Sequence, residues 1–494
     1  MTSPSTFRLR LEEIDTEVAA LRARLEELAI TRTDVVAQLE RVVYPRVLDV
    51  PIEIMSQIFL LCEGSIRIGN TDLAQDVPFV LASVCCRWRA LALSMPELWN
   101  TFKVDSTWHE SNEEAAVRKL ELCTERAGAR RDIVISLLSA SKLEVIVPMV
   151  APTVGRWSRC EAYEGYLERF LQQGQRFSSL RSLTMRHQWD CKATSPLSIS
   201  AEDAPLLRHV ELNQIDGIGL PWAQLTKLSL SDSLDSDKCV TVLSLATNLE
   251  YLHLEFTMFY RYPLLSRSAQ RLKLKRLHTL SLRWKSECYA AAINFFDLVI
   301  LPELRSFTTD IPHRAETGQR EVTTIKNMLA RSECGSNLRF LTLYFLGYSN
   351  HGLPFTQILA TTPILERLTL PNLSKEDLHS VLHVLTSGVC DTRIVELCVE
   401  MQHHCIPFQS LAVFVSGQLE QQSDGDSIGF RCLKVFVPPK AREWYEERNR
   451  SGFEMLQHLA AQSGGPQIYV TNYDATPLIE STSQPKPPKY SWYL

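Results

Sequence analysis

Apolar residues in the first part of the chain recur at alternating steps of three and four, which is the spacing of a heptad seam. The pattern is interrupted by Arg32 and ends at Pro45, because proline does not continue a helix. It predicts a long helix over residues 11–42 within a coiled-coil-like segment, 1–45. Because such a seam favours a helical partner, we expect a weak homodimer through residues 11–28, parallel or antiparallel. The seam positions are Leu11, Ile14, Val18, Leu21, Leu25, Leu28, Val35, Leu39 and Val42.

Short apolar faces mark residues 46–104. The stretch "PIEIMSQIFLLC" predicts a helix that starts at Pro51 and has Ile54, Ile58 and Leu61 on one face. A loop then leads to "FVLASVCCRWRALALS", which predicts one continuous helix, and "MPELW" opens a further turn. These segments predict a small all-helical module with more apolar surface than it can bury alone. The continuous helix would have one face formed by Val80, Val84, Trp88 and Leu91.

The pattern Leu-x-x-Leu-x-Leu, with conservative replacements, recurs over residues 180–437. Most of its first positions lie 24 to 29 residues apart, which is typical of leucine-rich repeats. One such unit cannot bury its own apolar side, so stacked units share a continuous core. The predicted fold class is therefore α/β, with an irregular leucine-rich-repeat solenoid over 105–470. Its parallel strands would line a concave face and its helices the outside. The proline-rich tail, 471–494, is expected to be disordered.

In such repeats the leucines point inward, so the residues between them point to the concave face. These residues combine aromatic groups with both signs of charge, which suits a protein substrate better than a nucleic acid. A plain solvated sheet face is the alternative. The candidate substrate-binding residues are Arg186, His209, Glu211, Tyr251, His253, Arg283, Phe340, Tyr344 and Arg367, with Thr184, Lys227, Glu255, Thr342, Glu396 and Glu400 beside them.

Composition narrows the class of protein. The net charge of the 494-residue chain is -5, which gives no electrostatic footprint for nucleic acid. No apolar run is long enough to cross a membrane, and the N-terminus lacks the apolar core of a secretory signal. The thirteen cysteines are scattered, without any C-x-x-C pair, so we expect free thiols. An intracellular location, cytoplasmic or nuclear, is therefore expected, with no membrane association.

Candidate chemistry is sparse. The chain has no nucleophile elbow, P-loop, dinucleotide fingerprint or H-E-x-x-H, so we expect no enzyme and no cofactor. The stretch "CVEMQHHC" brings Cys398 near His403, His404 and Cys405, but zinc modules space such ligands more widely. We interpret it as a surface turn, with no metal. Vicinal Cys85 and Cys86 would form a strained disulfide, so we interpret Cys85 as a packing residue.

The segment from 50 to 99 resembles an F-box of the kind abundant in mushroom-forming fungi. In the first half Pro51, Glu53 and Ile54 match the family pattern, as does the pair Ile58-Phe59. Val50 replaces the usual leucine, and the loop over 63–78 is longer than in a minimal F-box. The matches in the second half are Val84, Cys85, Trp88, Arg89, Pro96, Leu98 and Trp99.

The resemblance implies that the F-box docks to the Skp adaptor, and through it to cullin, in a ubiquitin ligase. The downstream repeats would then capture a protein substrate, and ubiquitin transfer would belong to other subunits. The alternative is a non-catalytic leucine-rich-repeat scaffold that does not enter a ubiquitin ligase. The implied adaptor-binding residues are Pro51, Ile54, Ile58, Phe59, Leu81, Val84, Cys85, Trp88, Pro96, Leu98 and Trp99.

Overall fold

The chain forms two compact units, Met1–Ser141 and Lys142–Leu494, in a computed structural model. The first unit therefore extends beyond the boundary at 104 that was expected between the helical module and the repeats. The structure describes residues 4–43, 50–62, 64–69, 73, 76–104, 113–129, 132–138, 143–186, 196–231, 236–256, 271–284, 289–312, 315–346, 355–387, 394–401, 407–422, 429–437, 450–462, 466–472 and 477–479.

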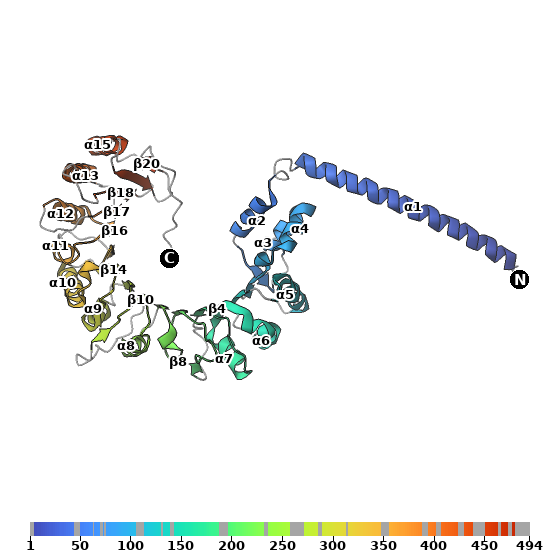
Figure 1. The fold of residues 1–494 in the computed structure, drawn as a ribbon, viewed down its shortest axis with the longest axis horizontal. Coiled ribbons are helices and arrows are strands. Elements are labelled where there is room, and N and C mark those ends of the chain that lie inside the picture. Colours follow the sequence, from blue (N-terminus) through green and yellow to red (C-terminus); the bar gives the residue numbers. More distant parts are fainter. Residues whose placement is uncertain are drawn as a thin grey trace. The chain divides into compact units, whose positions relative to one another are not determined.

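The predicted N-terminal helix is confirmed, and it is longer than expected. Helix α1 runs over Pro4–Val43 without a break at Arg32 (Figure 1). The side chains described over residues 7–39 are all exposed except Val36, which is half-buried. The seam positions from Leu11 to Leu39 are thus uncovered by the described parts of the chain.

The rest of the first unit mixes helices and strands, so the expectation of an all-helical module was wrong. Strand β1 lies inside the expected loop and pairs in parallel with β2, which in turn pairs in parallel with β3. These strands bury Ile66, Phe102 and Ile135 in register. The elements are α2 (Ile52–Leu61), β1 (Ile66–Ile68), α3 (Val77–Val84), α4 (Cys86–Ser94), η2 (Pro96–Trp99), β2 (Thr101–Val104), α5 (Glu113–Ala127) and β3 (Ile133–Leu137).

The single helix expected over 79–94 is in fact two helices that meet at Cys85. The backbone of Cys85 is extended, with φ -157° and ψ 171°, and it separates α3 from α4. The break lets the two helices pack against each other, and each buries its own apolar residue, Leu81 in α3 and Leu91 in α4. Helical periodicity alone does not reveal such a break, because each half keeps the period of 3.6 residues.

The second unit is built on a large parallel sheet, as the repeats predicted. The strands follow one another in the order β4-β5-β7-β9-β10-β12-β14-β15-β16-β17-β18-β19, and β20 pairs antiparallel with β19. The main strands are β4 (Trp157–Tyr163), β5 (Ser182–Arg186), β7 (His209–Leu212), β9 (Lys227–Leu230), β10 (Tyr251–Phe256), β12 (Thr279–Trp284), β14 (Ser306–Pro312), β15 (Phe340–Leu346), β16 (Arg367–Leu373), β17 (Glu396–Met401), β18 (Cys432–Val437), β19 (Gln467–Asn472) and β20 (Pro477–Ile479).

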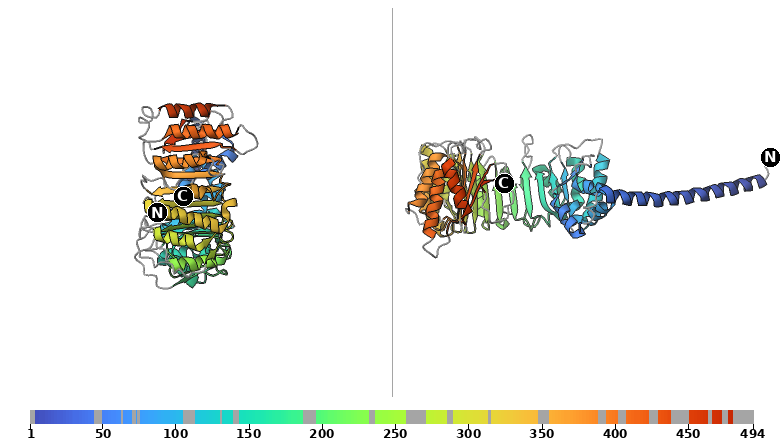
Figure 2. Two further views of the ribbon diagram at one scale, coloured as in Figure 1. Left: turned by 90° about the vertical axis from the view of Figure 1, so that its left-hand side faces the viewer. Right: turned by 90° about the horizontal axis from the view of Figure 1, so that it is seen from above.

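Helices connect many of these strands and lie on one side of the sheet, as Figures 1 and 2 show for α8 to α15. The other side carries no helix among the described elements of this unit. Two short pairs, β6 with β8 and β11 with β13, lie apart from the main sheet. The remaining elements are α6 (Leu143–Val150), η4 (Ala151–Arg156), α7 (Glu164–Gln172), β6 (Leu197–Ser198), β8 (Ile218–Gly219), η5 (Trp222–Gln224), α8 (Ser236–Leu245), β11 (Leu272–Lys273), α9 (Tyr289–Leu298), β13 (Val299–Ile300), α10 (Ala315–Ser332), η7 (Cys334–Ser336), α11 (Phe355–Leu359), α12 (Lys375–Thr386), α13 (Phe408–Gln422) and α15 (Arg450–Ala461).

The strand register aligns the repeats and forms the core. The middle apolar residue of each repeat lies opposite its counterpart on the next strand, as Leu228, Leu252 and Leu280 do. These residues are fully buried beneath the helices. The tail expected to be disordered from 471 is partly ordered, because β19 continues to Asn472 and β20 pairs with it. Residues 480–494 lie outside the described parts.

Candidate protein-interaction surfaces

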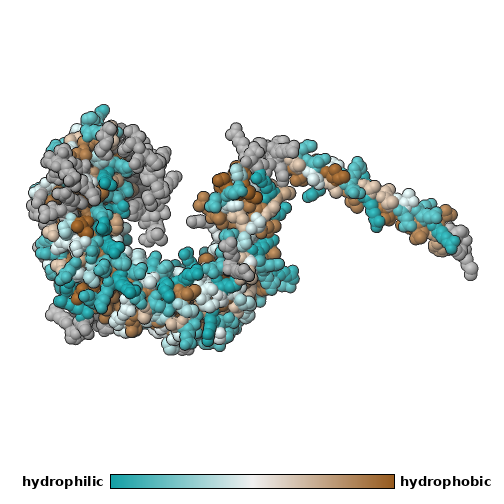
Figure 3. Space-filling view, viewed as in Figure 1, coloured by the Kyte–Doolittle hydropathy of each residue, from teal (hydrophilic) through white to brown (hydrophobic). Residues whose placement is uncertain are grey.

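One face of α2 is apolar and open to solvent. Pro51 precedes this helix, and Ile54, Ile58 and Leu61 follow on the same side at steps of three and four. Ile54 is 53% exposed, Ile58 is 43% exposed and Leu61 is 79% exposed. We call these four residues the α2 stripe; Figure 3 shows apolar residues gathered in this region. Because burying one such side chain is worth about 1.5–3 kcal/mol, the stripe favours a partner.

Other residues of the expected adaptor-binding set form the core of the first unit. Phe59 and Trp99 are fully buried, and Leu81 and Leu98 are at most 9% exposed. A partner therefore reaches Pro51, Ile54 and Ile58 without rearrangement, but not these four side chains. Val84, Cys85, Trp88 and Pro96 are half-buried.

Aromatic contacts hold α2 in place. The rings of Phe59 and Trp88 meet edge to face with centroids 5.0 Å apart, which ties α2 to α4. The Trp99 ring packs against Phe79 in the same way at 5.2 Å, and its indole nitrogen donates a hydrogen bond to the carbonyl of Ala92. Within α2 itself, Met55 and Phe59 are buried, whereas Ile54, Ile58 and Leu61 of the stripe stay exposed.

Cys85 acts as the cap of a helix. Its sulfur accepts a hydrogen bond from the backbone nitrogen of Trp88 at 3.4 Å, at the start of α4. That nitrogen would otherwise lack an acceptor in the first helical turn. Among the described cysteines, Cys85 and Cys86 included, none is joined in a disulfide.

Two arginines of the same segment tie the helices together. Arg87 donates to the carbonyl oxygen of Val50 at 3.1 Å, directly before the α2 stripe. Arg89 donates to the carbonyl oxygen of Ala82 at 2.8 Å and so connects α4 with α3 across the break. Arg87 therefore connects α4 with the residue that precedes the stripe, and the motif residue Arg89 connects α4 with α3.

The helix-free side of the second unit's sheet brings the expected substrate-binding residues into rows. His209, Lys227 and Tyr251 lie opposite one another on neighbouring strands, and a second row contains Glu211, Ser229 and His253. Further along the first row, Phe340 lies opposite Arg367. We call this side the open face. His209 and Arg367 are exposed, whereas Arg186, Glu211, Tyr251, His253, Arg283, Phe340 and Tyr344 are half-buried.

Arg283 is the centre of one cluster on the open face. Its Nε lies 2.7 Å from Oδ1 of Asp310, and its guanidinium lies 3.9 Å from the ring centre of Tyr344. Burial raises the pKa of Asp310 to about 6, although Arg283 and the Trp284 N–H oppose this rise. Burial also lowers the pKa of His253, helped by the charge of Arg283. Asp310 was not among the residues predicted from the sequence, although it lies on the same side of β14 as Ser306 and Thr308.

Two further clusters on the open face contain ion pairs. Arg186 bonds to Glu161 at 3.0 Å and lies 3.7 Å from Glu211. Glu396 accepts from both Arg367 and Lys434 at 2.6 Å. Burial alone would raise the pKa of Glu396, but these two cations outweigh it and lower the pKa. Along its described residues, the open face therefore presents paired charges beside aromatic rings, without a stripe of one sign.

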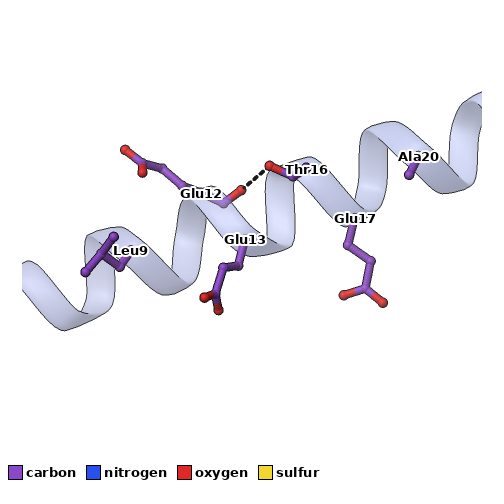
Figure 4. Close-up of a pocket in the computed structure, with 6 residues that line it drawn as sticks. All are labelled: Leu9, Glu12, Glu13, Thr16, Glu17 and Ala20. Carbon is purple, nitrogen blue, oxygen red and sulfur yellow. Dashed lines mark hydrogen bonds between the residues drawn. The ribbon is translucent and has the colours of Figure 1, made fainter.

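A shallow surface site lies along α1, and Figure 4 shows its lining residues spread over one exposed stretch of that helix. No group of three His, Cys, Asp or Glu side chains within the described ranges is arranged to hold a metal ion. Of the expected turn "CVEMQHHC", Cys398 is buried on β17, and His403, His404 and Cys405 lie outside the described residues.

Helices long and apolar enough to cross a membrane are absent from the described parts of the chain. Comparison with known proteins does not assign the chain to a family. No protein-family model matches this sequence, and no curated protein matches it significantly.

Proposed function

We propose that this chain is the substrate-recognition subunit of a Skp–cullin–F-box ubiquitin ligase. The α2 stripe carries this proposal: three large aliphatic side chains and Pro51 are held open to solvent at the positions where the sequence resembles an F-box. In this proposal the stripe binds the Skp adaptor. Trp88 supports α2 through its ring contact with Phe59.

The second unit would act as an irregular leucine-rich-repeat solenoid whose open face binds a protein substrate. Its aromatic groups and paired charges of both signs support a protein epitope, because such groups dominate protein interfaces. The net charge of -5 and the absence of a basic stripe among the described open-face residues disfavour nucleic acid. The chain would supply recognition, and other subunits would transfer ubiquitin.

Co-purification tests the proposal. The tagged full-length chain should bring down the Skp adaptor and cullin, and the double variant Pro51→Ser/Ile54→Asp should lose both. Serine preserves the start of α2, because it is a good N-cap residue, and Ile54 is exposed, so the first unit should stay folded. We expect at least about a tenfold loss of adaptor affinity from removing this apolar contact.

Val413→Asp is the matched control, because Val413 is an apolar residue of the second unit that is 55% exposed. This variant should keep full adaptor binding. If the wild-type chain fails to bind the adaptor, or if the double variant binds it unchanged, the ubiquitin-ligase proposal is wrong. The scaffold alternative would then be favoured.

A further inference from the structure

The seam of α1 is exposed along its whole described length. Leu11, Leu21 and Leu25 are 61%, 58% and 68% exposed, and the other seam residues between 11 and 28 are also exposed. Figure 3 shows apolar residues distributed among polar ones along this helix. Such a helix is stable when a second helix covers the seam.

The heptad phase assigns each residue of the helix to a position. With Leu11 at position a, Ile14 occupies position d. Arg32 then occupies an a position beyond Leu28, and Phe7 occupies a d position before Leu11. The flanking e positions hold Asp15 and Arg22. Neither of these two side chains has an ion pair within the described residues.

We propose that α1 forms an antiparallel homodimer in which the two copies cross between Val18 and Leu21. In this register Leu11 of one copy packs on Leu28 of the other, and Ile14 packs on Leu25. Antiparallel helices place e positions opposite e positions, so Asp15 faces Arg22 of the second copy, twice by symmetry. Likewise Glu17 faces Arg24, whose present partner is Glu27 of its own helix.

Arg32 favours the antiparallel pair over the parallel one. A parallel pair in register would place Arg32 against the same residue of the second copy, with two like charges inside the seam. The antiparallel pair places Arg32 beside Phe7, which is 62% exposed and offers an aromatic face to the guanidinium. The overlap from 7 to 32 then spans about 39 Å at 1.5 Å per residue. The first units of the two copies would follow from opposite ends of this pair.

Charge reversal distinguishes the two orientations. Asp15→Arg alone and Arg22→Glu alone place like charges together in either orientation. We expect each to raise the dimer dissociation constant about tenfold, since two symmetry-related pairs are affected. The double variant Asp15→Arg/Arg22→Glu restores opposite charges only in the antiparallel dimer. In the parallel dimer its introduced arginine would face Arg10 and its introduced glutamate would face Glu17 of the second copy, so it would be weaker than either single variant.

Sedimentation equilibrium of the full-length chain at micromolar concentration measures these effects. Glu12→Arg is the control, because Glu12 extends from a different side of α1 than Glu17, as Figure 4 shows. The proposal predicts that the control matches the wild type and that the double variant recovers wild-type affinity within about threefold. A monomeric wild-type chain, a double variant weaker than the singles, or a dimer indifferent to all four variants would each overturn it. The readout is molecular mass, so it does not depend on adaptor binding.

Discussion

The guanidinium of Arg283 neutralises the buried carboxylate of Asp310, with Nε and Oδ1 2.7 Å apart and Asp310 only 2% exposed. Burial raises the pKa of Asp310 from its ordinary value of 3.8 to about 6. Between pH 3.8 and about 6, the carboxyl group of Asp310 is therefore protonated to a greater extent in the folded protein than in the unfolded protein. The contribution of Asp310 to the free energy of unfolding therefore falls as the pH rises from 3.8 to about 6. The pair thus makes the open face sensitive to mildly acidic pH.

Arg283→Ala should lower the stability of the second unit at pH 8 by about 1–3 kcal/mol, because it leaves the carboxylate of Asp310 without its cation. At pH 5 the loss should be smaller, since Asp310 is then protonated. Thermal unfolding at the two pH values measures this difference. Adding Asp310→Asn to Arg283→Ala should remove the pH dependence, and a loss equal at both pH values would contradict the expectation.

Glu321 gives a second pH dependence from the helix side of the sheet. It is fully buried in α10, neither carboxylate oxygen has a hydrogen-bond partner within the described residues, and burial raises its pKa to about 8. Stability should therefore fall with rising pH between about 4.5 and 8, by at most about 1.4 kcal/mol per pH unit. Glu321→Gln should match the wild type at pH 5 and exceed it at pH 9 in chemical denaturation. The exposed Glu303→Gln should leave the wild-type profile unchanged.

The cap at Cys85 predicts a difference between two small substitutions. Cys85→Ser keeps an acceptor for the Trp88 N–H and should retain the stability of the first unit. Cys85→Ala removes the acceptor and should cost about 0.5–1 kcal/mol, a typical value for a lost N-cap. Thermal unfolding compares the two variants directly. Equal stabilities would show that the sulfur does not cap α4.

Two glycines in neighbouring helices should respond in opposite directions to alanine. A Cβ at Gly452 in α15 would lie 2.3 Å from the backbone nitrogen of Gln409, so Gly452→Ala should force α15 away from α13 and lower the melting temperature. A Cβ at Gly417 in α13 would meet nothing within 4 Å. Gly417→Ala should therefore raise stability by about 0.5–1 kcal/mol through helix propensity. A gain from both substitutions would rule out the close approach of the two helices.

Much of the sheet was predictable, because the spacing of buried residues determines which side of a strand faces the core. The main-sheet strands β5, β7, β9, β10, β12 and β14 to β18 were predictable for this reason. Strands β2 and β4 were missed although Trp157, Cys160 and Ala162 keep the same spacing, as do three residues that end at Val104. The repeat pattern is defined by leucine-like residues, whereas the core accepts tryptophan, cysteine and alanine at equivalent positions.

The candidate sites were predictable only in part. Apolar periodicity places Ile54 and Phe59 on α2, but it does not say which side of the helix is covered. That depends on tertiary contacts such as the one between Phe59 and Trp88. Asp310 was missed because β14 extends further than the repeat pattern, and its ion pair with Arg283 joins neighbouring strands. Periodicity along one strand gives no information about partners on the next.

The alternation of buried and open-face residues on each strand separates two kinds of substitution. On β10, Leu252 and Leu254 are fully buried, whereas Tyr251 and His253, which alternate with them, are half-buried on the open face. A change at such an open-face position alters the chemistry of the surface while the strand beneath keeps its place. Outside positions such as Arg283, which holds a buried carboxylate, the same sheet can therefore present many different surfaces in descendants of this chain with little accumulated loss of folding stability.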